Sequence, residues 1–136
     1  LAVLVVALPI RLSRAANEAS AETCLRLADR PPAEGNDAIN ELERCSVVVP
    51  LDVELLADLG AAYESAGRPQ DAEKTYQNVL TLDPDYADVR VRLATLLLGR
   101  GDAPEARYHA EQALRMQPNR THVRQLLDEI ARSTTP

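Results

Sequence analysis

A repeat with a period of 34 residues constrains this chain more than any other feature of its sequence. Five pairs of equal or similar residues stand 34 positions apart, namely Gly67 and Gly101, Asp71 and Glu105, Ala72 and Ala106, Leu80 and Leu114, and Pro84 and Pro118. A weaker copy extends the offset upstream, because Asp37, Ala38 and Pro50 precede three of these residues by the same distance. Repeats of about this length are typical of arrays in which each unit buries its apolar face only against its neighbours. We therefore expect a stacked repeat architecture.

The apolar residues within each period follow helical spacing. Three such stripes mark first helices, and they are Leu55, Leu59, Ala62 and Tyr63, then Val89, Leu93, Leu96 and Leu97, then Val123, Leu127, Ile130 and Ala131. Second helices are predicted from Asp71 to Leu82 and from Pro104 to Gln117, each between a glycine and a proline. Gly67 and Gly101 provide the positive φ that ends a helix at low cost, and proline cannot continue a helix. The pattern predicts antiparallel helix pairs.

Composition agrees with an all-α chain and argues against nucleic acid as a partner. The 136 residues include no Phe, no Trp and four Tyr, so the core must be built from Leu, Val and Ala, which suits closely packed helices. The net charge is −6, and Arg11 and Arg14 are the only charged residues among residues 1–17, so the rest carries −6 − 2 = −8. Nucleic acid binding needs a basic surface, which so acidic a body does not offer.

The repeated residues resemble the tetratricopeptide repeat family, whose pattern is a Leu-Gly pair, a Tyr, a turn Gly, an Ala, an aromatic residue, an Ala and a Pro. One copy fills these places with Leu59-Gly60, Tyr63, Gly67, Ala72, Tyr76, Val79 and Pro84. The next copy keeps Leu93, Gly101, Ala106, Ala113 and Pro118, with Ala94, Leu97 and Ala110 in the other places. The resemblance implies stacked antiparallel helix-turn-helix repeats, that is, a short α-solenoid.

The repeat boundaries divide the chain into five predicted segments. These are an apolar N-terminal arm with a basic flank at 1–18, a degenerate hairpin at 19–52, full repeats at 53–86 and 87–120, and a C-terminal capping helix with its tail at 121–136. Two hairpins and a cap bury little apolar surface alone. We therefore expect the degenerate hairpin or an assembly partner to complete the stack.

Residues 1–10 contain no polar side chain and are followed directly by a basic flank. Such a segment is unfavourable in water and requires a partner surface. Three interpretations are open, namely the end of a membrane anchor, an arm that inserts into a neighbouring subunit, and the remainder of a signal peptide. The residues expected to make this contact are Leu1, Val3, Leu4, Val5, Val6, Leu8 and Ile10. The expected location is a membrane-anchored periplasmic, secreted or cell-surface one rather than the cytoplasm.

Cys24 and Cys45 are the only cysteines, and both lie on predicted helices of the degenerate hairpin. Neighbouring helices bring α-carbons within the distance of about 6 Å that a disulfide needs. A disulfide is one interpretation, and two buried thiols are the other.

Catalytic chemistry has no visible signature in this sequence. His109 and His122, the only histidines, lie on different predicted helices without a second ligand at metal spacing, and we expect both at the surface. Motifs for nucleophilic catalysis, zinc hydrolysis, phosphate binding and dinucleotide binding do not occur. We expect no enzymatic activity, no cofactor, no metal and no small-molecule substrate.

The resemblance also implies where a protein partner would bind, because in this family the first helices line a concave groove. By register, the groove residues are Glu54, Ala57, Ala61, Glu64, Asp88, Val91, Thr95, Leu98, His122, Gln125 and Glu129. Members that bind a peptide carboxylate use Lys and Asn where this chain has Ala57 and Ala61, so a carboxylate clamp is not expected. The small and acidic set favours an apolar or basic helix or extended segment as partner.

Two functions are consistent with these features. In the first, the chain is a scaffold or accessory subunit of a larger assembly, held at a membrane by its apolar start, and it docks a partner through the groove. In the second, the chain is the structural subunit of a fibre, in which the arm inserts into the next copy and the repeats stack end to end.

Overall fold

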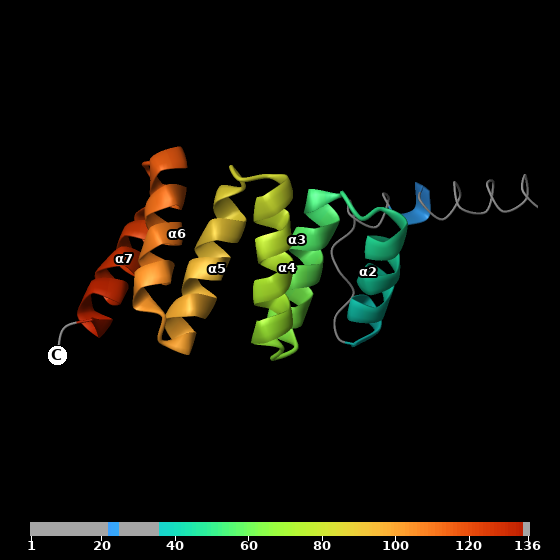
Figure 1. The fold of residues 1–136 in the computed structure, drawn as a ribbon, viewed down its shortest axis with the longest axis horizontal. Helices are drawn as coiled ribbons and strands as arrows, with labels where there is room; N and C mark the ends of the chain where they lie inside the picture. The colour runs from blue at the N-terminus through green and yellow to red at the C-terminus, as the bar shows by residue number, and fades with distance from the viewer. Residues whose placement is uncertain (1–21, 25–35, 135–136) are drawn as a thin grey trace, which may run out of the picture.

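The structure, a computed structural model of the 136-residue chain, describes residues 22–24 and 36–134. Residues 22–24 are helical. The helices that follow are α2 (Asn36–Val48), α3 (Val53–Ser65), α4 (Pro69–Leu82), α5 (Ala87–Arg100), α6 (Ala103–Met116) and α7 (Thr121–Ser133). They lie side by side in chain order along one long axis (Figure 1). The described residues include no strand, and the predicted all-α, short-solenoid fold is confirmed.

The ends of the helices follow from local residue chemistry. Asp52 caps α3, because its Oδ1 accepts a hydrogen bond from the Leu55 amide at 3.0 Å. Asp102 caps α6 in the same way by accepting from the Glu105 amide. Gly67 and Gly101 have positive φ values of 71° and 91°, as expected for glycines in the turns between paired helices. Helix α4 begins two residues earlier than predicted, at Pro69, because proline suits the first helical turn, where its missing amide proton is not needed.

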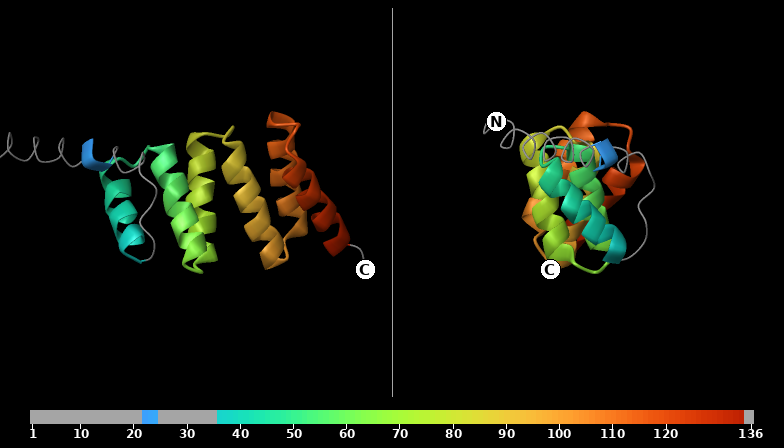
Figure 2. Two further views of the ribbon diagram at one scale, coloured as in Figure 1. Left: turned by 180° about the vertical axis from the view of Figure 1, so that it is seen from behind. Right: turned by 90° about the vertical axis from the view of Figure 1, so that its right-hand side faces the viewer.

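The helices pack as consecutive hairpins. Helix α3 packs most extensively on α4 and α5 on α6, while α7 packs on α6 and also contacts α5. The left view of Figure 2 shows this stacking from behind. On α7 the prediction was partly wrong, because Val123, Leu126 and Ile130 are buried whereas Ala131 is exposed. As the last described helix, α7 is covered by protein on one side only, which leaves a narrower buried face.

Gly60 allows α3 and α4 to approach closely. A Cβ atom at this position would lie 2.7 Å from Cδ1 of Tyr76 and closer still to its Cε1. The Tyr76 ring is fully buried, so it has no room to move away. In the next repeat the equivalent positions are Ala94 and Ala110, both fully buried. The two repeats therefore fill the same space in different ways, one with glycine and a ring, the other with two methyl groups.

A disulfide between Cys24 and Cys45 joins residues 22–24 to α2, with α-carbons 5.3 Å apart. Both cysteines are buried in one cluster with Ile39 and Leu42. Apart from residues 22–24, the first helix of the degenerate hairpin lies outside the described residues, as do the arm at 1–18 and its seven predicted contact residues. Within residues 22–24 and 36–134, no helix is long and apolar enough to cross a membrane.

Candidate partner-binding groove

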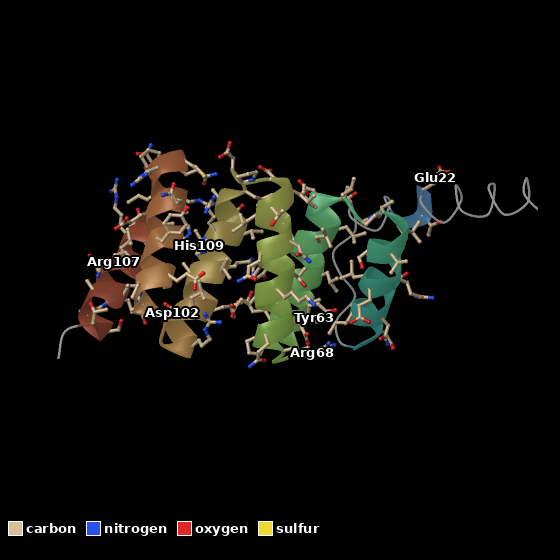
Figure 3. All side chains as sticks on the ribbon, viewed as in Figure 1. Glu22, Tyr63, Arg68, Asp102, Arg107 and His109 are labelled. Carbon is tan, nitrogen blue, oxygen red and sulfur yellow. A yellow bond between two sulfur atoms is a disulfide. The ribbon has the colours of Figure 1, made fainter. Side chains whose placement is uncertain are left out.

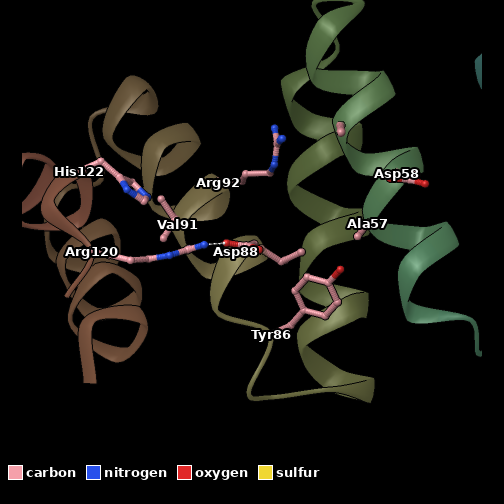
Figure 4. Close-up of a pocket in the computed structure, with 10 residues that line it drawn as sticks. Ala57, Asp58, Tyr86, Asp88, Val91, Arg92, Arg120 and His122 are labelled. Atoms are coloured by element: carbon pink, nitrogen blue, oxygen red, sulfur yellow. Dashed lines mark ion pairs between the residues drawn. The ribbon is translucent and has the colours of Figure 1, made fainter. Parts of the chain in front are cut away.

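A cavity of about 370 Å³ opens between α3, α5 and the start of α7. We call it the groove. Its lining residues are Ala57, Asp58 and Ala61 of α3, Tyr86 before α5, Asp88, Val89, Val91 and Arg92 of α5, Arg120 before α7, and His122 of α7 (Figure 4). The space exists because α3 presents two alanines where larger side chains would fill it. All three helices are first helices of their repeats, which the 34-residue period places on one side of the stack.

Five of the eleven predicted groove residues line this cavity, namely Ala57, Ala61, Asp88, Val91 and His122. The other six, Glu54, Glu64, Thr95, Leu98, Gln125 and Glu129, do not line it. The cavity is also lined by five residues that register did not predict, namely Asp58, Tyr86, Val89, Arg92 and Arg120. The period could have indicated four of these five as groove positions. Asp58 and Arg92 occupy equivalent positions of successive repeats, 34 residues apart, as do Tyr86 and Arg120.

Arg92 is held in place by the carboxylate of Glu64. Its Nη1 lies 3.2 Å from Glu64 Oε2, and the same oxygen accepts a hydrogen bond from the Tyr76 hydroxyl at 2.8 Å. Burial, followed by this hydrogen bond, raises the pKa of Tyr76 well above its ordinary value. The three side chains come from α3, α4 and α5. Glu64 is therefore a structural partner inside the stack rather than a free groove acid.

Arg120 forms an ion pair with Asp88, which connects the start of α7 to the first turn of α5 (Figure 4). Both arginines that line the groove are thus paired with carboxylates of the chain itself. The sequence predicted a small, acidic groove. The cavity is lined by the two predicted alanines and by Asp88, but also by these two cations, because register alone does not show which charges meet.

Asp58 places a negative charge at one end of the groove, and Tyr86 lines the same end. Asp58 is half-buried, and its pKa is raised by this burial first and by repulsion from Glu54 next, while Arg92 acts in the opposite direction. Burial also raises the pKa of Tyr86, and nearby carboxylates add to the effect, with Glu54 the largest contributor and Asp88 next. We call the part of the groove between these two side chains the Tyr86 corner.

Comparisons with known proteins settle the family. A tetratricopeptide repeat sequence profile matches residues 63–130, which is half of the chain, and a second profile of the same description matches residues 34–87. The chain belongs to the tetratricopeptide repeat family. A comparison with curated protein sequences gave no match.

Solved tetratricopeptide repeat structures share the fold. The crystal structure of MamA protein superimposes with a TM-score of 0.76 at 24% identity, covering 90% of this chain and 67% of that one. The Yersinia enterocolitica type III secretion chaperone SycD, in complex with a peptide of the translocator YopD, gives 0.69 at 18% identity over 87% and 94%. The second TPR domain of human RPAP3, in complex with an HSP70 peptide, gives 0.65 at 24% over 69% and 78%.

His109 lies away from the groove, between the helices of a tetratricopeptide repeat. It is half-buried on α6, and its Nδ1 lies 3.4 Å from Nη1 of Arg90, whose Nε and Nη2 donate to the Pro84 carbonyl at 2.9 and 2.7 Å. Burial and then Arg90 lower the pKa of His109. The prediction of a surface histidine is wrong here, because the imidazole packs beside Arg90. One period later, the equivalent arginine makes the equivalent hydrogen bond, since Arg124 Nη2 donates to the Pro118 carbonyl at 2.6 Å.

Tyr63 connects the first full tetratricopeptide repeat to α2. Its hydroxyl donates to Glu43 Oε1 at 2.7 Å, and the guanidinium of Arg68 lies over its ring, 4.4 Å from the centroid (Figure 3). Burial and the hydrogen bond to Glu43 raise the pKa of Tyr63 to about 12. No three His, Cys, Asp or Glu side chains in the described part of the chain are placed to share a metal ion.

Proposed function

We propose that this chain is a non-catalytic protein-binding module that holds a peptide or helix of another protein in its groove. The observation that carries the proposal is the cavity of about 370 Å³ over Ala57 and Ala61, walled by three first helices. Its size is within the range of functional pockets, and a groove that runs across stacked helices suits an elongated ligand. The peptide complexes of SycD and RPAP3 support the same use of this fold.

We also propose that the module is exported or membrane-anchored, as a scaffold or accessory subunit of a larger assembly. Two features support this location. Disulfides such as Cys24–Cys45 persist in oxidising compartments and are rare in the cytosol. The apolar residues 1–10 suit membrane contact or a partner subunit.

The alternative of a self-assembling fibre has less support. End-to-end stacking requires complementary surfaces at the two ends of the solenoid. The exposed residues of α7 include Arg124, Asp128 and Arg132. Near the end of α2, in contrast, Val47 is 81% and Leu51 74% exposed. The exposed residues of α2 also include Asp37 and Arg44, so these surfaces give no specific end-to-end fit, whereas the groove is a defined site, and we favour the binding module.

A selection experiment tests the binding proposal. A displayed library of random peptides about 12 residues long would be selected against the full chain, and binding of the selected peptides measured by calorimetry. The double variant Ala57→Gln and Ala61→Gln fills the cavity, so we expect affinity to fall at least about tenfold, or about 1.4 kcal/mol. Asn78→Gln, at an exposed position of α4, is the control and should bind like the parent chain.

Two results would contradict the proposal. One is a library that yields no peptide, and the other is a set of peptides that bind the filled variant as tightly as the control. Circular dichroism of each variant shows that a loss of affinity does not reflect a loss of the helical fold.

A further inference from the structure

Each of the two cations in the groove is paired with a carboxylate of the chain itself. Arg92 is paired with Glu64 at 3.2 Å, and Arg120 with Asp88. An acidic ligand would compete with a carboxylate that already pairs with each arginine, and would bring a second negative charge close to it. The charge pairing in the groove therefore disfavours acidic partners.

Asp58 is the lining carboxylate that is not paired with an arginine. Among the residues that the structure describes it makes no hydrogen bond and no ion pair, although it is half-buried in the wall of the groove. Asp58 is therefore the one unpaired carboxylate among the lining residues, beside the ion pairs Arg92–Glu64 and Arg120–Asp88, and Glu54 adds a further negative charge one turn earlier on α3. A ligand that covers Asp58 without pairing it would bury an uncompensated charge.

Tyr86 provides an aromatic surface in the same part of the groove. Figure 4 shows its hydroxyl directed toward Ala57 on α3, the neighbour of Asp58 in the chain. The carboxylates of Glu54, Asp88, Asp58 and Asp83 all act on this hydroxyl in the same direction. An aromatic face beside carboxylates is a favourable environment for an ammonium or guanidinium group, through cation–π and charge attraction.

Another part of the groove is apolar. Ala57 and Ala61 form one wall, and Val89 and Val91 contribute from α5. Val91 is half-buried, so it retains surface that a ligand can cover. Small apolar side chains of an extended segment fit such a surface, and their burial would contribute to affinity.

We propose that the partner is a basic, apolar peptide segment that places a Lys or Arg side chain in the Tyr86 corner and small apolar side chains over Ala57, Ala61 and Val91. This inference rests on the proposed function and specifies the partner chemistry of the same groove. It predicts charge complementarity with Asp58 as the main source of selectivity.

The test uses the peptides selected from the random library against the full chain. We expect the selected sequences to be enriched in Lys or Arg next to Ala, Val or Leu. Calorimetry would then compare a selected peptide and its Lys→Gln counterpart on the parent chain, on Asp58→Asn and on the control Glu111→Gln, which removes an exposed carboxylate from α6. The basic peptide should lose about fivefold to tenfold in affinity on Asp58→Asn and none on the control.

The Lys→Gln peptide should bind Asp58→Asn at least as tightly as the parent chain, since it cannot pair the charge of Asp58 and the variant removes that charge. A charge exchange adds an independent arm, because Asp58→Lys should prefer a Lys→Glu peptide over the basic one. Enrichment of Asp or Glu, or an equal effect of Asp58→Asn and Glu111→Gln, would overturn the inference while leaving the groove as a binding site. A library that yields no peptide, or peptides insensitive to filling of the groove, would overturn the proposed function itself.

Discussion

Gly60 and Tyr76 show how single residues set the distance between helices. The glycine lets the buried ring lie against the backbone of α3, and the ring extends its hydroxyl to Glu64 at 2.8 Å. Gly99 is the opposite case, because a Cβ atom there would meet nothing within 4 Å. Packing therefore requires glycine at position 60 but not at position 99, and the two alanine substitutions should have different effects on stability.

Gly60→Ala should destabilise the chain and Gly99→Ala should not. At Gly60 the added methyl group overpacks the interface with Tyr76, and we expect the free energy of unfolding to fall by about 1–3 kcal/mol. At Gly99 alanine relieves the helical cost of glycine, so stability should rise by up to about 1 kcal/mol. Urea unfolding of both variants measures the difference. Equal stability of the two would show that α3 and α4 do not approach closely at Gly60.

The sequence predicted groove positions through register, but it did not predict their interactions. Ala57, Ala61 and Val91 were found because the repeat places them on the first helices. The pairing of Arg92 with Glu64 depends on side chains 28 residues apart, on helices of different repeats, and no single-repeat pattern contains that contact. The role of Asp58 as the unpaired carboxylate of the groove follows only from the pairing of both arginines with other carboxylates.

At the scale of elements, the connection between α2 and the full repeats depends strongly on Tyr63. Its hydroxyl bonds Glu43 of α2, and Arg68 covers its ring from the turn before α4. The second helices of the two full repeats, α4 and α6, were predictable to within about two residues, because a glycine and a proline flank each of them. The Tyr63 contact to Glu43 was not, because a tyrosine expected by the family pattern says nothing about its partner in the preceding helix.

The contribution of Tyr63 to stability should disappear at alkaline pH. Its pKa is raised from 10.0 to about 12 in the folded chain, so the folded state keeps the proton that the unfolded state loses above pH 10. The stabilisation is therefore complete below about pH 10 and is lost as the pH rises toward 12. Tyr63→Phe should lower the free energy of unfolding by about 1 kcal/mol at neutral pH.

Urea unfolding at about pH 8 and pH 11 measures this effect, and the gap between the parent chain and Tyr63→Phe should narrow at the higher pH. Tyr108→Phe is the control, since that ring is exposed on α6. A gap that stays constant with pH would show that the hydroxyl does not bond Glu43 in solution.

At the scale of the whole molecule, stacking creates a surface that no single hairpin has. The first helices α3, α5 and α7 lie along one side, and the cavity opens between them. The overall fold was predictable because a period of 34 residues fixes both the hairpin and its repetition. The depth and charge of the groove were not predictable, since they depend on which side chains of successive repeats pair with one another.

The central claim is that this side of the stack binds another protein, and backbone amide chemical shifts measured by NMR test it most directly. A selected peptide would be titrated into the isotope-labelled full chain. The account predicts that the largest shift changes occur at Ala57, Asp58, Ala61, Tyr86 and Val91. Changes concentrated instead on the exposed faces of α4 and α6, for example at Asn78 and Tyr108, would contradict it.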